Sequence, residues 1–187
     1  MFDLFYKETE NEAILYYLFM MSDGEVSSSE EQIFGEICRE LKIEQSNKDK
    51  IIDECKKLET ESTKIYDCII REKIDEKVQQ DWLGTKDASS LARIIWNLVN
   101  LGYADKNYSD NEREIVDFLI ARWNINKEIY QEMVDTADTI LGLIKQKEWI
   151  CSTIQNNYER NFKSERIDVE IEKMISDIKL SCEELAM

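Results

Sequence analysis

Asp-Gly-Glu-Val-Ser-Ser-Ser-Glu at residues 23–30 and Asp-Lys-Asn-Tyr-Ser-Asp-Asn-Glu at residues 105–112 are two versions of one acidic stretch, 82 residues apart. In each version a Ser follows the leading Asp by four residues, and a Glu follows it by seven. Apolar residues at helical spacing match at the same offset: Ile33 with Ile115, Ile37 with Leu119, Leu41 with Trp123, Ile43 with Ile125, and Tyr16, Tyr17 and Phe19 with Leu98, Val99 and Leu101. The chain is therefore predicted to hold a duplicated unit of helix, short acidic loop and helix.

Each acidic stretch carries the signals that start a helix. Ser27 with Glu30, and Ser109 with Glu112, have the spacing of a capping box, in which the hydroxyl and the carboxylate each accept a backbone N–H. Val26 and Tyr108 stand just before the caps, where a hydrophobic staple residue belongs. Gly24 allows a positive φ in the tight turn that leaves the first helix.

Capping leaves the leading aspartates unexplained. Duplicated helix pairs often pack about a pseudo-twofold axis, and such packing would bring Asp23, Glu30, Asp105 and Glu112 together. Neighbouring carboxylates repel, which raises some of their pKa values unless a cation neutralises them. Because a hard divalent cation prefers oxygen ligands, these four residues are the candidate metal ligands.

Composition predicts an all-α protein. The 187 residues are 43% hydrophobic, with no proline and five glycines. This is enough for one domain with a sizeable core plus an extension. We expect a helical domain over residues 1–145, with repeats at about 9–80 and 87–145, and a C-terminal helical extension over 146–187. No stretch is apolar for long enough to span a membrane, and the first residues lack the pattern of a signal peptide.

The net charge of −16 argues against nucleic-acid binding, which needs clustered Lys and Arg. The acidic charge leaves four roles open: a solvated surface, cation binding, binding of a basic partner, or mimicry of a nucleic-acid surface. The chain has five cysteines without C-x-x-C spacing, which fits reduced thiols in the cytoplasm. It has no histidine, which excludes catalytic mechanisms and zinc sites that depend on one.

Periodicity places the individual helices. We expect helices over about 9–21, 28–41, from Asp87 or Ser89 to 103, 110–123 and 127–144, then another near 149–158. Between the second helix and the one that starts at Asp87 or Ser89, residues 46–58, with Ser46 as N-cap, and 65–74 form either one long bent helix or two helices. Gly84 marks a loop between the repeats. In the last segment Ile167, Ile171, Met174, Ile178 and Leu185 form a stripe of about two and a half heptads. That stripe either docks on the domain or serves as an arm for a dimer or a protein partner.

The two acidic turns, Met20–Ser27 ahead of Glu30 and Gly102–Asp105 ahead of Ser109 and Glu112, resemble those of the TerB-like (tellurite-resistance TerB) family over roughly residues 9–145. The resemblance implies an all-helical domain of pseudo-twofold symmetry with two such turns. It also implies a cytoplasmic or membrane-associated accessory protein of bacterial stress and tellurite resistance, with no enzymatic activity. Carried over residue by residue, it implies a divalent metal near Asp23, Glu30, Asp105 and Glu112. The sequence departs from the pattern at Lys106, which stands in the second loop where the first loop has Gly24. The Lys106 side chain is expected to neutralise part of the negative charge of the second loop.

Three other kinds of protein could carry acidic loops of this type. An EF-hand is rejected, because Ser28 and Asp110 stand where its sharp turn needs Gly, and Phe34 and Val116 stand where it needs Glu. An interaction module without a bound ligand would dock a partner through its acidic surface or C-terminal helix. An enzyme using paired carboxylates on metal-bound water is disfavoured, because carboxylates alone specify no reaction.

Overall fold

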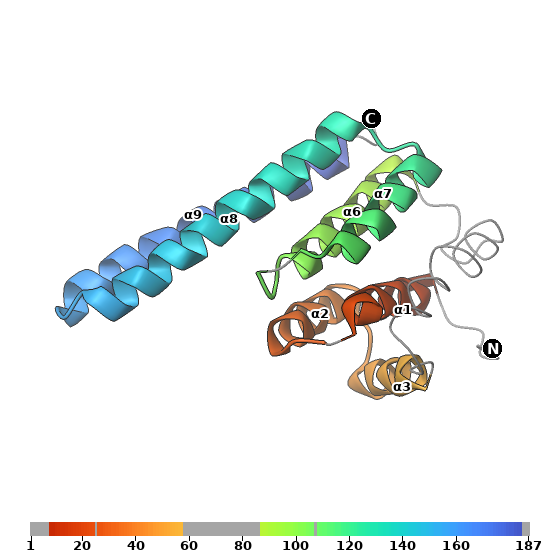
Figure 1. The fold of residues 1–187 in the computed structure, drawn as a ribbon, viewed down its shortest axis with the longest axis horizontal. Coiled ribbons are helices and arrows are strands. Elements are labelled where there is room, and N and C mark those ends of the chain that lie inside the picture. Colours follow the sequence, from red (N-terminus) through yellow and green to blue (C-terminus); the bar gives the residue numbers. More distant parts are fainter. Residues whose placement is uncertain (1–7, 25, 58–86, 107, 185–187) are drawn as a thin grey trace.

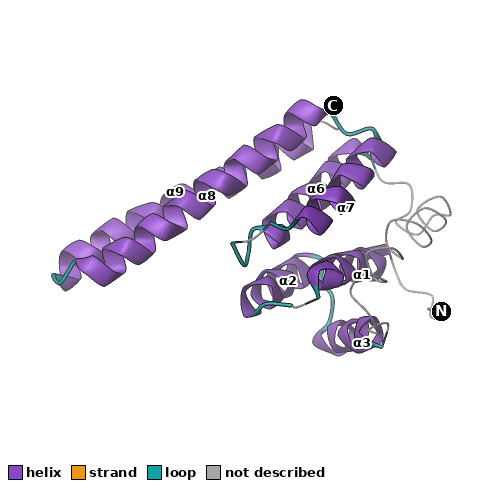
Figure 2. Cartoon of the chain, viewed as in Figure 1, coloured by secondary structure: helices purple, strands orange, loops and turns teal. Residues whose placement is uncertain are grey.

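The computed structural model describes residues 8–24, 26–57, 87–106 and 108–184, and every regular element in these ranges is helical (Figure 1 and Figure 2). The elements are α1 (Glu8–Met20), the short 3-10 turn η1 (Met21–Asp23), α2 (Ser28–Glu40), α3 (Gln45–Lys56), α6 (Ala88–Gly102), α7 (Asp110–Trp123), α8 (Lys127–Thr153) and α9 (Asn157–Glu184). The predicted all-α class is confirmed. The predictions for residues 65–80, the loop with Gly84, Cys68 and Leu185 lie outside the described residues.

The helices form three groups in space. In Figure 1, α1, α2 and α3 lie together at the bottom, and α6 and α7 form a pair above them. The long helices α8 and α9 run side by side as an antiparallel hairpin that extends to the left beyond the other helices. α6 contacts both α8 and α9, so the base of the hairpin is part of the body.

α1 is the centre of the first group. Its apolar residues are spread around the whole helix, so a single buried face cannot accommodate them. Every residue from Ala13 to Met20 is buried, and α1 packs against α2, α3, α6 and α7. The prediction that this helix is buried on most sides is confirmed.

Several helix boundaries differ from their predicted positions. α2 begins at Ser28 as predicted, and Asp87 caps α6 by accepting the N–H of Ser90 at 2.8 Å. Ser46 is not an N-cap, because α3 already begins at Gln45. α8 continues past the predicted end near 144 to Thr153, since no proline or cap residue interrupts it. The prediction of a separate helix near 149–158 is therefore wrong: residues 149–153 belong to α8, and α9 begins at Asn157.

The C-terminal stripe lies inside the molecule. Ile167 and Ile178 are buried, and Ile171 and Met174 are partly buried against the core. Cys182 in the last turns of α9 is also buried. α9 therefore completes the core with the face that carried the heptad signal.

A buried polar network joins α1 to α6. Glu12 is 0% exposed and receives both guanidinium nitrogens of Arg93, Nη1 at 2.8 Å and Nη2 at 3.0 Å. Tyr16 donates its hydroxyl to Glu12 at 2.7 Å, and Asn97 donates to the Tyr16 oxygen at 3.0 Å. Each of these buried groups therefore has a partner, as a buried polar cluster requires.

Replacing Arg93 with Met should destabilise the fold, because it leaves the Glu12 carboxylate buried without a counter-charge. We expect the free energy of unfolding to fall by about 3 kcal/mol, the low end for a broken buried pair, since the Arg93 side chain is 34% exposed. Chemical denaturation at pH 7 measures the loss.

The double variant E12Q/R93M should recover most of that stability, because it removes the unpaired charge and keeps the oxygen that accepts from Tyr16. R39M is the matched control, since the Arg39 side chain is 75% exposed and pairs only loosely with Glu36 at 3.9 Å. Equal losses in R93M and R39M would contradict the central role of the Glu12–Arg93 pair.

Candidate functional site

Both acidic loops end in the predicted capping boxes. The N–H of Glu30 donates to Ser27 Oγ at 3.1 Å, and the N–H of Ser27 donates to Glu30 Oε2 at 2.7 Å. In the second loop the N–H of Glu112 donates to Ser109 Oγ at 3.3 Å, and the N–H of Ser109 donates to Glu112 Oε2 at 2.7 Å. Each Glu is thus fixed in place by one of its two carboxylate oxygens.

The backbone repeats its unusual conformations at the 82-residue spacing. Gly24 has φ 99° and Lys106 has φ 72°, at equivalent positions of the two loops. Lys42 and Asn124, with φ 56° and 53°, form a second equivalent pair after α2 and α7. The two units therefore share local geometry, while the pseudo-twofold axis between them stays a prediction.

The two loops are neighbours in space. Asn111 Nδ2 at the start of α7 donates to the carbonyl oxygen of Ser22 in η1 at 3.3 Å. The carboxyl of Glu30 is close enough to Asp23 and Asp105 for their charges to act on it, and Glu112 is similarly influenced by Asp23 and Glu30. The structure thus brings all four predicted residues into one electrostatic cluster.

The four carboxyl groups fall into two pairs by exposure. Glu30 and Glu112 are 2% and 3% exposed, whereas Asp23 and Asp105 are exposed. Burial raises the pKa of Glu112 to about 7, the hydrogen bonds from Ser109 oppose that rise, and the charges of Asp23 and Glu30 add to it. Burial likewise raises the pKa of Glu30. The site therefore holds protons more tightly than ordinary carboxylates do.

The cluster is not arranged as a finished coordination shell. Within the described ranges, no three acidic or cysteine side chains lie in an arrangement that could hold a metal ion. The buried Ser22 hydroxyl, next to Asp23, makes no hydrogen bond to a described residue. Glu30 and Glu112 would offer a cation their second carboxylate oxygens, and Asp23 and Asp105 would supply the remaining ligands. The chemistry of the donor set, four carboxylates, fits a hard cation.

Lys106 is directed toward another part of the molecule than expected. Its Nζ pairs with Glu148 Oε1 of α8 at 2.7 Å, so the positive charge of Lys106 neutralises a carboxylate of the α8–α9 hairpin. A cleft of about 330 Å³ lies alongside, between α2, the end of α6 and α8. Its apolar wall consists of Ile33, Ile140, Leu141 and Ile144, and its polar lining includes Ser29, Gln32, Asn100, Lys106 and Glu148.

Several contacts that shape the second loop were not indicated by the sequence pattern. The Arg113 guanidinium lies 4.3 Å from the centre of the Tyr108 ring, and Arg113 Nε donates to the Tyr108 carbonyl at 3.2 Å. Gly102 packs so closely against Tyr108 that a Cβ there would come within 2.4 Å of the ring. Tyr108 was expected as a staple residue, but the sequence pattern did not indicate that its ring packs between Gly102 and Arg113.

The fold and the paired loops define an all-α domain built around two capped acidic turns. The sequence matches the family model described as tellurite resistance protein TerB over residues 10–135, and the chain belongs to this family. The match runs from α1 into the first part of α8, and α9 lies beyond it. Comparison with curated proteins and with solved structures gives no match. None of the described helices combines the length and apolarity needed to cross a membrane.

Replacing Glu112 with Gln should flatten the pH dependence of stability. The folded state holds the Glu112 proton up to about pH 7 and the unfolded state releases it near pH 4.5. The free energy of unfolding of the wild type should therefore fall as the pH rises through this window. The difference between wild type and E112Q should change on the order of 1–3 kcal/mol across it.

Gln retains the capping box, so E112Q isolates the titration from the cap. Urea denaturation between pH 4.5 and 7.5 provides the profile, and E114Q on the exposed side of α7 is the control. Identical slopes for E112Q and wild type would show that Glu112 titrates as an ordinary carboxyl.

Proposed function

We propose that this TerB-family protein is an accessory protein of bacterial stress or tellurite resistance that binds a divalent cation between its two acidic loops. The observation that carries the proposal is the cluster of Glu30 and Glu112, both buried, with Asp23 and Asp105 close enough to raise carboxyl pKa values. Like charges held together out of water are unfavourable, and a bound cation relieves the repulsion.

The proposed ligands have different roles. Glu30 and Glu112 are held by their capping bonds, so they provide fixed oxygens at the bottom of the site. Asp23 and Asp105 are exposed at the loop surface and supply the remaining carboxylate oxygens. Oxygen-only ligands favour Ca²⁺ or Mg²⁺ over softer metals. Because α1, through η1, and α6 lead into the loops, cation binding would act on the core helices, as a sensor or scaffold requires.

We further propose that the protein acts in the cytoplasm and binds rather than catalyses. The chain has no histidine, and the four carboxyl groups do not specify a reaction by themselves. An interaction module that binds no cation is the second candidate. It is favoured by the incomplete coordination geometry of the described loops and by the exposed aromatic residues of the hairpin.

Addition of Ca²⁺ or Mg²⁺ should stabilise the wild type. At ten times the Kd the free energy of unfolding rises by about 1.4 kcal/mol, which corresponds to a Tm increase of roughly 3–6 °C. The increase should be larger at pH 8 than at pH 5.5, because binding requires ionised Glu112. Thermal melts after EDTA treatment, with each cation added back, provide the measurement.

The variant D23N/D105N should lose this response and keep the fold, because neither aspartate belongs to a capping box. D53N/D177N changes the net charge by the same amount on exposed positions of α3 and α9, and it should respond as wild type does. If melts of the wild type stay unchanged with every cation at both pH values, the cation site is ruled out and the interaction module remains.

A further inference from the structure

The outward face of α9 carries a line of large apolar side chains. Tyr158, Phe162, Val169 and Leu180 are 82%, 53%, 65% and 55% exposed. At about 100° per residue, these four positions fall within about 40° of one another around the helix. They form one stripe, here called the outer stripe, from the first turn of α9 to its last turns.

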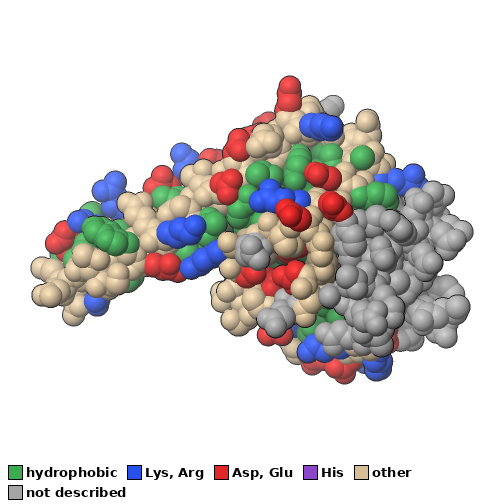
Figure 3. Space-filling view, in the orientation of Figure 1, with side chains coloured by type: hydrophobic (Ala, Val, Ile, Leu, Met, Phe, Trp, Pro, Cys, Tyr) green, Lys and Arg blue, Asp and Glu red, His purple; other side chains and the backbone are tan. Residues whose placement is uncertain are grey.

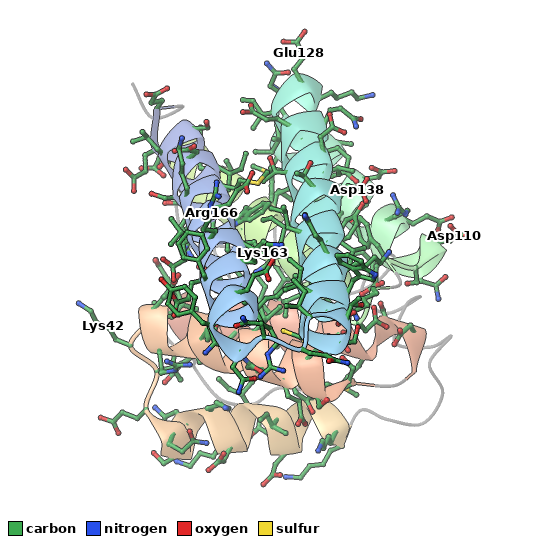
Figure 4. The ribbon with its side chains drawn as sticks, turned by 90° about the vertical axis from the view of Figure 1, so that its left-hand side faces the viewer. Lys42, Asp110, Glu128, Asp138, Lys163 and Arg166 are labelled. Atoms are coloured by element: carbon green, nitrogen blue, oxygen red, sulfur yellow. The ribbon has the colours of Figure 1, made fainter. Side chains whose placement is uncertain are left out.

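The opposite face of α9 is packed inside the protein. Ile167, Ile178 and Cys182 are buried there, and Ile171, Met174 and Ile175 pack against the core. A helix with two opposed apolar faces normally buries both. Within the described part of the chain, α9 buries only one. Figure 3 shows apolar side chains at the surface of the projecting hairpin, and Figure 4 shows α8 and α9 side by side in front of the body.

Charges of opposite sign border the outer stripe. Glu165 and Glu172 lie along one edge, and Arg166 and Lys173 lie along the other, by the same helical arithmetic. All four side chains are exposed, and none of them takes part in an ion pair with another described residue. Glu159 lies beyond the basic edge and Lys179 beyond the acidic edge, and they are already paired with Lys163 and Glu40. Two more exposed carboxylates, Glu170 and Asp177, also lie beyond the basic edge. The charges nearest the stripe thus form an acidic edge and a basic edge.

We propose that the outer stripe is a dimer interface, in which α9 packs parallel and in register against α9 of a second copy. A twofold axis along the two helices places the acidic edge of each copy opposite the basic edge of the other. Glu165 then faces Arg166 of the second copy, and Glu172 faces its Lys173. An antiparallel pair would place acid against acid and base against base, which is unfavourable.

This interface is distinct from the stripe that the sequence offered for dimerisation. Ile167, Ile171, Met174 and Ile178 already pack within the chain, so they are not available to a second copy. The two copies each carry a net charge of −16, and their long-range repulsion opposes association. We therefore expect a concentration-dependent dimer that is favoured near 0.15 M salt, where the Debye length is about 8 Å. It does not depend on the proposed cation site.

Exchanging the charges of one edge tests the arrangement. R166E/K173E makes both edges acidic and E165K/E172K makes both basic, so each variant alone should sediment as a monomer at concentrations where the wild type is a dimer. A mixture of the two variants should restore the dimer, because each copy then offers the complementary edges. Analytical ultracentrifugation measures the species, and circular dichroism confirms that each variant is folded.

K50E/K57E, on α3 and at its C-cap, introduces the same charge change away from the stripe and should leave the dimer intact. A monomeric wild type at millimolar concentration would overturn the proposal. Wild-type-like dimers in both edge variants would also overturn it.

The orientation is tested by cross-linking. Ser176 is exposed and lies in line with the outer stripe. In a background with Cys68 and Cys151 changed to Ser, S176C should form a disulfide-linked dimer on mild oxidation, since a parallel pair places the two positions at one height. A disulfide that forms only when S176C is mixed with F162C would indicate an antiparallel pair and overturn the proposed geometry.

Discussion

The buried carboxylate of Glu12 is the constraint from which the arrangement of the two units follows. A charge with no exposure to water is unfavourable unless it is paired and hydrogen-bonded, and both conditions are met by Arg93 and Tyr16. These partners come from both helices: Tyr16 from α1 itself and Arg93 from α6, 81 residues away in sequence. Any sliding of α1 along α6 would break the two-point contact of the guanidinium with the carboxylate. The pair therefore fixes the register of the two units as well as their contact.

That register decides where the acidic loops lie. α1 leads through η1 into the first loop, and α6 leads directly into the second. With the two helices locked, Ser22 and Asn111 come within hydrogen-bond distance and the four carboxyl groups share one electrostatic environment. Capping and clustering are compatible in Glu30 and Glu112, because the cap uses one oxygen of each carboxylate. The same buried groups thus start two helices and create the charge cluster.

The sequence predicted the local chemistry well and the tertiary contacts poorly. The capping spacing located the starts of α2 and α7, and the continuous apolar run of α1 indicated its central position, because both depend on nearby residues. The Glu12–Arg93 pair was not predicted, since the repeat places Ile94 and Asn11 at the equivalent positions and gives no signal for it. Lys106 was expected to neutralise its own loop, but its partner Glu148 lies 42 residues further along the chain. The convergence of Asp23, Glu30, Asp105 and Glu112 was inferred from assumed symmetry, and metal binding by them stays a prediction.

The C-terminal helices show why the boundary expected at residue 145 is not a structural one. α8 crosses that position without a break, and α9 returns along it to bury Ile178 and Cys182 in the core. Removing residues 146–187 would therefore expose core residues of the region that matches the family model. A loss of partner binding in the shortened protein would then not show that residues 146–187 form the contact surface. Substitutions at single exposed positions of α9 separate its packing role from a binding role, because the inner face of α9 stabilises the body and the outer stripe does not. The heptad pattern indicated the inner face, because apolar residues recur there at intervals of three and four. It missed the outer stripe, because gaps of seven and eleven residues separate three of its members, although the helix brings all four onto one face.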